Sequence, residues 1–194
     1  KKINGNIFER YASLKKNKVN FFYEKAQKKY VNKLKNYKLL KNNGVIEYPE
    51  HGFRELEGVC KKIEKLNGGA LFIDYGYEIQ KNQDTLQSIM KHKFNNLEDN
   101  IGKADITSLI NFSLYKRYFN YKNLYVENIL TQSEFLQKMG IVERFKIVSK
   151  KMNISDKSNL YSRLKRLIDP NMMGKNFKVI FAKNKKCNFS LAFK

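Results

Sequence analysis

The ten-residue stretch GGALFIDYGY, from Gly68 to Tyr77, constrains the fold of this chain more than any other. Before it, apolar residues from Phe53 to Leu66 recur at helical spacing, and Asn67 with the two glycines ends that helix. The four apolar residues that follow show no polar alternation, which predicts a strand covered on both faces, as in a parallel sheet. A helix, a glycine break and a buried strand make half of a βαβ unit, so we expect an α/β fold.

The acid that ends this strand marks a candidate binding edge. In open α/β sheets, ligands bind beyond the carboxyl ends of the strands, where this chain has Asp74, Tyr75 and Gly76. Gly76 permits a tight turn or a close backbone approach. Aspartate is also a common turn residue, so a purely structural role for Asp74 stays open.

The other patterns predict short strands and amphipathic helices, without an internal repeat or a linker between domains. Predicted strands cover 7–12 paired with 19–23, then 45–47, 124–126 and 177–182, with a return strand over 188–193. Predicted helices cover 112–119, a segment that a Thr131–Glu134 capping box opens and Gly140 ends, 141–148, and a segment that Ser155 or Asp156 caps and Asp169-Pro170 ends. Residues 25–43 fit either helix or loop, and 78–103 read as a long polar connection.

The chain is strongly basic, with a formal charge of +21 from 39 basic and 18 acidic residues. Such a charge suits binding to nucleic acid or to an acidic membrane surface. The lysines, however, are spread along the whole chain, and the abundance of Lys and Asn is typical of an AT-rich genome. We therefore expect solvated lysines, no specific nucleic-acid partner and no membrane span.

Motifs for several kinds of chemistry are missing from the sequence. It has no Walker-type phosphate loop, no GxSxG, no HExxH and no GxGxxG. With only two histidines and two distant cysteines, we expect no metal centre and no disulfide. The residues alone support a candidate ligand edge, each member of which is also a common turn or cap residue. This edge comprises Asp74, Tyr75, Asp84, His92, Asp105 and Thr107.

Several motifs together resemble a known family. In chain order they are GGALFIDYGY, DTLQSIMKHKF, GKADIT, TQSEFLQKMGI and DPNMMGKNFKVIFAKNK. Their order and spacing resemble the C-terminal half of the MidA-type methyltransferases, a family that includes the mitochondrial assembly factor of respiratory complex I. The resemblance runs from about Val45 to Lys183, with weaker support from Phe8-Glu9-Arg10.

The resemblance implies a Rossmann-like class I fold that uses S-adenosylmethionine (SAM), with a family-specific helical insertion. On this basis residues 1–194 are the C-terminal part of a single methyltransferase domain, with the insertion inside 78–176. The family's glycine-rich SAM motif has no counterpart here, so we expect a truncated chain that binds SAM weakly or not at all.

The implied activity is protein arginine methylation linked to complex I assembly, with a core subunit of NADH:quinone oxidoreductase as the protein substrate. The implied compartment is the bacterial cytoplasm or the mitochondrial matrix, the former being favoured.

Residue roles follow from the same resemblance and from the chemistry of methyl transfer, in which carboxylates orient a guanidinium and accept its proton. The predicted catalytic residues are Asp74, His92 and Asp105. The predicted cofactor-binding residues are Asp74, Tyr75 and Gly76, and the predicted acceptor-binding residues are Tyr75, Asp84, Thr85, Thr107 and Arg144.

The chain departs from the family at two positions. Where the family often has a histidine and an aspartate, this sequence has Leu109 and Asn111. This loss keeps a second hypothesis open, a non-catalytic module that binds a respiratory-chain subunit. A third hypothesis, a basic nucleic-acid-binding domain, depends on the net charge alone.

Overall fold

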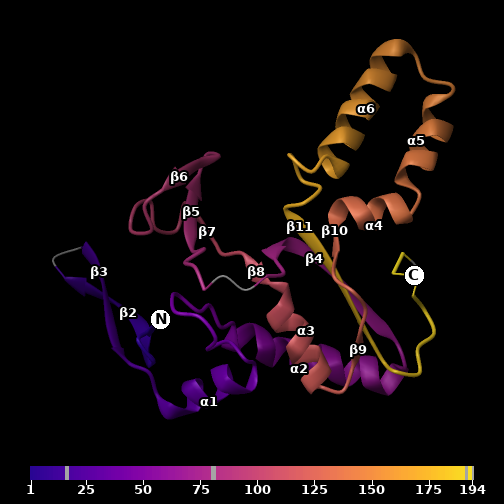
Figure 1. Ribbon diagram of the computed structural model, residues 1–194. Helices are drawn as coiled ribbons and strands as arrows, with labels where there is room; N and C mark the ends of the chain where they lie inside the picture. The colour runs from indigo at the N-terminus through magenta and orange to yellow at the C-terminus, as the bar shows by residue number, and fades with distance from the viewer. Residues whose placement is uncertain (16–17, 80–81, 191, 194) are drawn as a thin grey trace. The chain divides into compact units, whose positions relative to one another are not determined.

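The computed structural model describes residues 1–15, 18–79, 82–190 and 192–193, and the chain forms two compact units (Figure 1). Unit 1 comprises residues 1–50 and 79–109, and unit 2 comprises residues 51–78 and 110–194. Each unit has its own sheets, so each is described by itself.

Unit 1 begins with an antiparallel meander. Its strands are β1 (Lys2–Ile3), β2 (Asn6–Lys15) and β3 (Lys18–Lys25), in the order β1-β2-β3. The β2–β3 register runs from Phe8 opposite Lys25 to Lys15 opposite Lys18, which confirms the predicted pairing of 7–12 with 19–23. Helix α1 (Lys28–Asn36) follows and buries Leu34, so part of the segment left open as helix or loop is helical.

A second small antiparallel sheet in unit 1 was missed by the sequence analysis. Strands β5 (Gln87–Met90), β6 (Lys93–Asn95) and β7 (Asp105–Thr107) pair in the order β6-β5-β7, inside the segment predicted as a polar connection. Lys91 and His92 both have positive φ and form the β5–β6 turn. The strands escaped prediction because they are short and carry few apolar residues on an alternating pattern.

The predicted strand over 45–47 is wrong. Gly44 makes one isolated bridge with Lys2, and residues 45–47 have no strand assignment. Val45 and Ile46 instead line a cavity, and the side chain of Glu47 is held by Thr85. Two adjacent apolar residues shortly before Pro49 therefore do not form a strand here, because their backbone pairs with no strand of the described chain.

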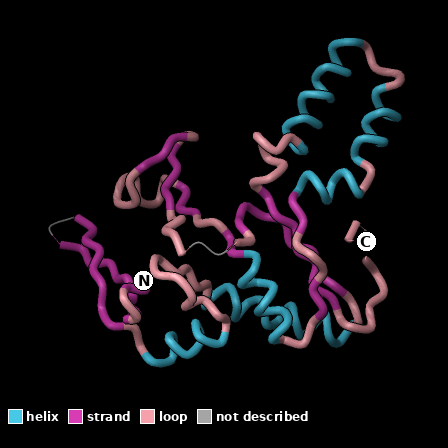
Figure 2. Tube along the Cα trace, viewed as in Figure 1, coloured by secondary structure: helices cyan, strands magenta, loops and turns pink. Residues whose placement is uncertain are grey.

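Unit 2 is built on a mixed sheet with the order β10-β11-β4-β8, in which β9 also pairs with β11 (Figures 1 and 2). Its strands are β4 (Gly69–Tyr77), β8 (Ile110–Asn111), β9 (Tyr125–Val126), β10 (Leu130–Thr131) and β11 (Phe177–Lys183). The predicted strands over 70–73, 124–126 and 177–182 are confirmed. No strand forms over 188–190 or 192–193, so the predicted return strand is wrong for the residues described there.

The surroundings of β4 differ from the prediction. It pairs antiparallel with β11 along its length and is parallel only to β8, at Gly76 and Tyr77. Phe72 stacks on Phe119 of α3, whereas Leu71 and Ile73 are each 44% exposed. In the chain described, one face of β4 is therefore covered and the other is open, so the prediction of burial on both faces is wrong.

The helices α2 (Glu50–Leu66) and α3 (Phe112–Tyr121), both predicted, form the core of unit 2 with β11. Phe53 stacks on Tyr118 with ring centroids 4.2 Å apart, and the Tyr118 hydroxyl donates to the Phe53 carbonyl at 2.7 Å. Val179 and Ile180 of β11 are fully buried. The apolar face that the sequence shows on α2 is thus the face that packs.

Three further helices follow β10: α4 (Gln132–Lys138), α5 (Ile141–Ser149) and α6 (Ile154–Ile168). The predicted capping box is confirmed, since Thr131 accepts from the Glu134 amide while Glu134 accepts from the Thr131 amide. The predicted caps for α6, Ser155 or Asp156, are wrong, because the cap is Asn153, whose side chain accepts from the Asp156 amide. The helices α5 and α6 form an antiparallel hairpin (Figure 1).

No helix among the described residues combines the length and apolarity that a membrane span requires.

Candidate functional site

The C-terminal half of β4 carries the first group of predicted site residues. The prediction that the strand ends at Asp74 is wrong, because β4 continues to Tyr77 and Asp74 pairs with Lys178 inside it. Asp74 is exposed, and its Oδ1 accepts from the Tyr75 amide at 2.7 Å. Tyr75 is 47% exposed, with its ring 3.8 Å from that of Phe177. Burial, and then the charge of Asp74, raises the pKa of the Tyr115 hydroxyl. Asp74 and Tyr75 therefore present a carboxylate and a ring that a ligand could contact.

Gly76 has a structural explanation. A Cβ at this position would lie 2.2 Å from the Ile110 carbonyl oxygen and 2.7 Å from the Phe112 ring. The backbone of Gly76 thus makes the predicted close approach, and it makes it to β8 and α3. The space that a glycine leaves free is filled by the protein, so a role for Gly76 in cofactor binding stays a prediction.

Asp84 and Thr85 are both held by partners within unit 1. Asp84 forms an ion pair with Arg10 at 2.5 Å, which raises the pKa of the Arg10 guanidinium, chiefly through the hydrogen bond. Thr85 donates its amide and its hydroxyl to Glu47, and its Oγ1 accepts from the Leu109 amide at 2.9 Å. The segment that begins with Asp84 is therefore tied to residues far away in the sequence.

The remaining predicted residues lie on exposed parts of their units. His92 occupies the β5–β6 turn. Asp105 and Thr107 lie on β7, opposite Ile89 and Gln87, and Thr107 accepts from the Gln87 side chain at 3.2 Å. In unit 2, Arg144 is exposed on α5. The structure thus brings Asp84 and Thr85 together with Arg10 and Glu47, and it leaves His92, Asp105 and Thr107 on the surface of the small sheet.

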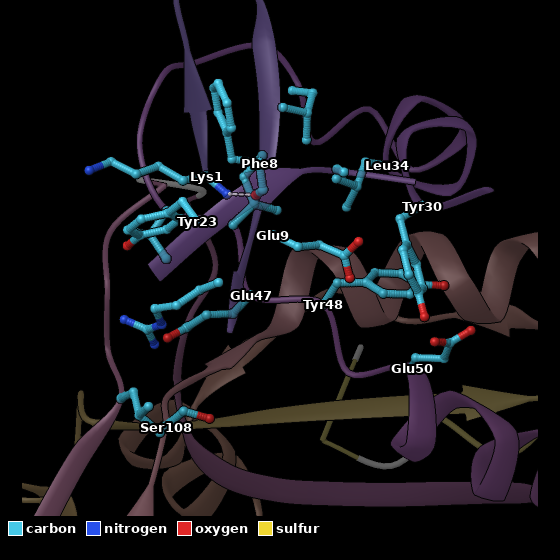
Figure 3. Close-up of a pocket in the computed structure, with 16 residues that line it drawn as sticks. Lys1, Phe8, Glu9, Tyr23, Tyr30, Leu34, Glu47, Tyr48, Glu50 and Ser108 are labelled. Atoms are coloured by element: carbon cyan, nitrogen blue, oxygen red, sulfur yellow. Dashed lines mark hydrogen bonds between the residues drawn. The ribbon is translucent and has the colours of Figure 1, made fainter. Parts of the chain in front are cut away.

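A cavity of about 430 Å³ in unit 1 was not predicted (Figure 3). Its polar lining is rich in carboxylates and tyrosines, contributed by β2, β3, α1, the segment before α2 and the first residue of α2. In Figure 3 the carboxylates of Glu9 and Glu50 lie on either side of the rings of Tyr30 and Tyr48. The acids and tyrosines of the lining are Glu9, Glu47, Glu50, Tyr23, Tyr30 and Tyr48.

The carboxylates that line this cavity differ in whether a cationic side chain is paired with them. Lys33 binds Glu50 at 2.5 Å and, with the Tyr30 hydroxyl, lowers the pKa of that carboxyl. Burial, and then the charge of Glu50, raises the pKa of Tyr48. Glu9 accepts from the Gln27 amide at 3.3 Å, and no lysine or arginine of the described chain forms an ion pair with it. Glu9 is therefore the carboxylate best placed to receive a cation.

The aromatic rings of the cavity also attract cations. The ammonium groups of Lys29 and Lys33 lie 4.7 and 5.8 Å from the ring centroid of Tyr30. A cation over such a ring is stabilised by the ring quadrupole. The only signal for this site in the sequence is that residues 1–50 are strongly basic and hold four acids, Glu9, Glu24, Glu47 and Glu50, of which all but Glu24 line the cavity. No fixed spacing joins them.

The two departures from the family pattern have different surroundings. Asn111 is buried and caps α3, because its Oδ1 accepts from the Leu114 amide at 3.1 Å and from the Ser113 hydroxyl at 2.9 Å. Aspartate caps helices equally well, so the asparagine keeps the cap and lacks the charge. Leu109 uses its backbone amide to bind Thr85.

Comparison with solved structures identifies the fold. A COG1565 superfamily member from Burkholderia thailandensis bound to S-adenosyl-homocysteine superposes with a TM-score of 0.77 over 97% of this chain and 50% of that chain, at 21% identity. An uncharacterized COG1565 superfamily protein from the same organism gives 0.76 over 95% and 50%, at 20% identity. The fold is therefore that of a Rossmann-like α/β methyltransferase, as predicted.

The family follows from the sequence comparison. Residues 1–129 match the model of the family described as "Putative S-adenosyl-L-methionine-dependent methyltransferase", so the chain belongs to this methyltransferase family. It is 29% identical over 122 residues to the protein arginine methyltransferase NDUFAF7, mitochondrial, of Danio rerio, and 32% identical over 123 residues to that of Homo sapiens. Each match covers 63% of this chain and 28% or 27% of the relative, so the chain aligns with less than a third of their length.

Proposed function

We propose that this chain carries the acceptor-binding part of a SAM-dependent protein arginine methyltransferase, and that Glu9 in the unit 1 cavity binds the guanidinium. Family membership supports the reaction class, and the names of the curated relatives support arginine as the acceptor. The observation that carries the proposal is the cavity itself, in which carboxylates and tyrosine rings gather within a chain of net charge +21.

The chemistry of the cavity suits a guanidinium. An arginine side chain is planar and carries five N–H donors, so it can bind a carboxylate and stack on an aromatic ring at the same time. Glu9 offers the carboxylate, and Tyr30 and Tyr48 offer rings beside it. Glu47 and Glu50 are already held by Thr85 and Lys33, so they shape the cavity and add negative potential.

Methyl transfer also requires a donor site and a proton acceptor. SAM would supply the methyl group from its sulfonium, and the guanidinium nitrogen would lose a proton as the new bond forms. Asp74 and Tyr75 fit one edge of a donor site because both side chains are exposed in the C-terminal half of β4. The proposed catalytic roles of Asp74, Asp105 and His92, and the contacts of Asp84, Thr85 and Thr107 with the acceptor, belong to the same hypothesis.

The substrate that we propose is a protein of the respiratory chain, in keeping with the mitochondrial relatives. We predict that the substrate is a core subunit of NADH:quinone oxidoreductase. We predict that methylation takes place in the bacterial cytoplasm, the compartment equivalent to the mitochondrial matrix. Electrostatics supports a protein acceptor over a nucleic acid at this cavity, because a phosphate would be repelled by its carboxylates.

The experiment is methyl transfer from radiolabelled SAM to the candidate subunit by the full-length protein. Glu9→Gln removes the charge and keeps the shape, so we expect KM for the protein substrate to rise and kcat/KM to fall by about 10–100-fold, as for loss of a charge-assisted hydrogen bond. Glu55→Gln, at an exposed position of α2, is the matched control and should change neither constant. Unchanged kinetics in Glu9→Gln would exclude the cavity as the acceptor site.

A second candidate function is a non-catalytic module that binds the same kind of subunit. The observation that favours it is Asn111, which keeps the helix cap without the carboxylate of the family. Restoring the acid by Asn111→Asp separates the two functions. A rise in methyl transfer would favour an enzyme weakened at this position, whereas subunit binding without turnover in both proteins would favour the module.

A further inference from the structure

An apolar groove of about 280 Å³ lies between α5 and α6 in unit 2, and it shares no lining residue with the unit 1 cavity. It is lined by aliphatic side chains, one aromatic ring and two arginines. The lining comprises Ile141, Arg144, Phe145, Val148, Leu160, Arg163, Leu164 and Leu167, of which Leu164 is buried.

The length of the groove suits a short helix. Its lining positions span Ile141 to Val148 on one helix and Leu160 to Leu167 on the other, which is two turns or roughly 10 Å at 1.5 Å per residue. A third helix laid between two antiparallel helices places apolar residues at i, i+3 or i+4, and i+7 along such a seam. The groove therefore fits an amphipathic helix of at least two turns.

The charges select the kind of helix. Arg144 and Arg163 are exposed, and neither forms an ion pair within the described chain. The hairpin carries further lysines and arginines and only two acids, Glu143 and Asp156, on α5 and α6. A ligand with carboxylates beside its apolar stripe would pair with the two arginines, whereas a basic ligand would be repelled.

From the groove and its two arginines we infer that the α5–α6 hairpin docks an acidic amphipathic helix of a protein partner. The partner inserts two or three apolar side chains between Phe145 and Leu164, and its acids lie against Arg144 and Arg163. Docking here requires no methyl transfer. It supplies a place where a protein partner is held by contacts that do not involve the reacting arginine.

The test uses the whole chain and a defined probe. The probe is a synthetic, fluorescently labelled 14-residue peptide with leucines at i, i+3, i+7 and i+10 and glutamates flanking them. Fluorescence anisotropy should show saturable binding to the wild-type chain. A peptide of the same composition in scrambled order, and a peptide with the same leucines and lysines in place of glutamates, should each bind at least tenfold more weakly.

Paired variants locate the binding on the protein. Arg144→Glu with Arg163→Glu should weaken binding of the glutamate peptide at least tenfold and improve binding of the lysine peptide. Lys146→Glu with Lys165→Glu is the matched control, because it makes the same change of charge on the same two helices outside the groove. Val148→Ser removes one apolar side chain from the lining of the groove. Because Val148 is 39% exposed, the change carries little risk to folding, and it should weaken binding severalfold.

Several results would overturn the inference. Equal losses in the two charge-reversal pairs would show attraction by net charge alone. Equal binding of the scrambled peptide would show that the groove does not recognise the apolar stripe of a helix. Self-association of the chain that Val148→Ser abolishes, measured by sedimentation, would assign the groove to a second copy. Binding to anionic vesicles that competes with the peptide would assign it to a lipid surface.

Discussion

Glu47 binds Thr85 through both of its carboxylate oxygens, across 38 residues of sequence. The Thr85 hydroxyl lies 2.9 Å from one oxygen and 2.7 Å from the other, and the Thr85 amide donates to the first at 2.8 Å. The same hydroxyl accepts from the Leu109 amide. One buried side chain thus joins the segment before α2, the segment before β5 and the residue that precedes β8.

This arrangement predicts a large cost for removing the hydroxyl. Thr85→Val keeps the volume and the amide bond to Glu47, but it removes the buried hydroxyl that binds the half-buried Glu47 carboxylate and the Leu109 amide, so we expect the free energy of unfolding to fall by about 1–3 kcal/mol. Urea denaturation followed by fluorescence measures it. Thr107→Val is the control, since Thr107 is exposed and makes one long hydrogen bond with Gln87, and it should stay within about 0.5 kcal/mol. Equal small effects in both variants would mean that the network adds no stability.

Elements with strong local signals could be predicted from the sequence. The helical spacing of apolar residues in α2 and the Thr131–Glu134 capping box both depend on neighbours within one or two turns. Their residue types therefore suffice to locate them. The cap of α6 was misplaced by two residues because Asn153, Ser155 and Asp156 are all good caps, and only the backbone geometry selects the first.

The surroundings of an element could not be predicted in the same way. The run Ala70–Ile73 predicts a strand correctly, but the strand that pairs along its length, β11, lies more than a hundred positions later in the chain. In the described chain Leu71 and Ile73 remain 44% exposed, although their types suggested burial. The unit 1 cavity could not be predicted for the same reason. Its residues Glu9, Tyr30 and Glu47 come from three separate segments, and no regular spacing in the sequence connects them.

Gly76 should tolerate no side chain. In Gly76→Ala the new Cβ would meet a backbone oxygen and an aromatic ring that are both fixed by packing, so we expect a loss of about 1–3 kcal/mol in the free energy of unfolding. Gly58→Ala is the opposite case, because Gly58 lies inside α2 with no atom within 4 Å of its added Cβ. It should stabilise by about 0.5–1 kcal/mol. Thermal melts of the two variants should therefore move in opposite directions, and a shift in the same direction would contradict the packing at Gly76.

The ion pair between Lys183 and Glu127 should behave as a buried pair. Their nitrogen and oxygen lie 2.7 Å apart, with side chains 9% and 11% exposed, and Lys183 also donates to the Phe189 carbonyl. Lys183→Met or Glu127→Gln alone leaves one buried charge without its partner and should cost about 3–5 kcal/mol. The double variant should cost less than the sum of the two, which a double-mutant cycle measures.

A surface pair provides the control for that cycle. Lys61 and Glu57 lie 3.8 Å apart, with side chains 74% and 43% exposed. Exposed pairs of this kind contribute about 0–1 kcal/mol, so Lys61→Met should have little effect. Coupling of equal size in both cycles would mean that burial does not strengthen the Lys183–Glu127 pair.

The capping box at the start of α4 predicts a dependence of stability on pH. The Thr131 amide, and then the Thr131 hydroxyl, bind the Glu134 carboxylate and lower its pKa below the ordinary value of 4.5. A carboxyl whose pKa is depressed in the folded state stabilises the fold above its unfolded pKa, and this contribution is lost as the pH falls through the folded pKa. Glu134→Gln keeps the hydrogen bonds of the box and removes only the charge at the helix N-terminus. At pH 7 the wild-type chain should therefore be more stable than the variant by about 0.3–1 kcal/mol, and the difference should be smaller at pH 3, below the ordinary pKa of a glutamate. Urea denaturation at the two pH values measures the difference. A gap of equal size at both would show that the charge of Glu134 does not stabilise α4.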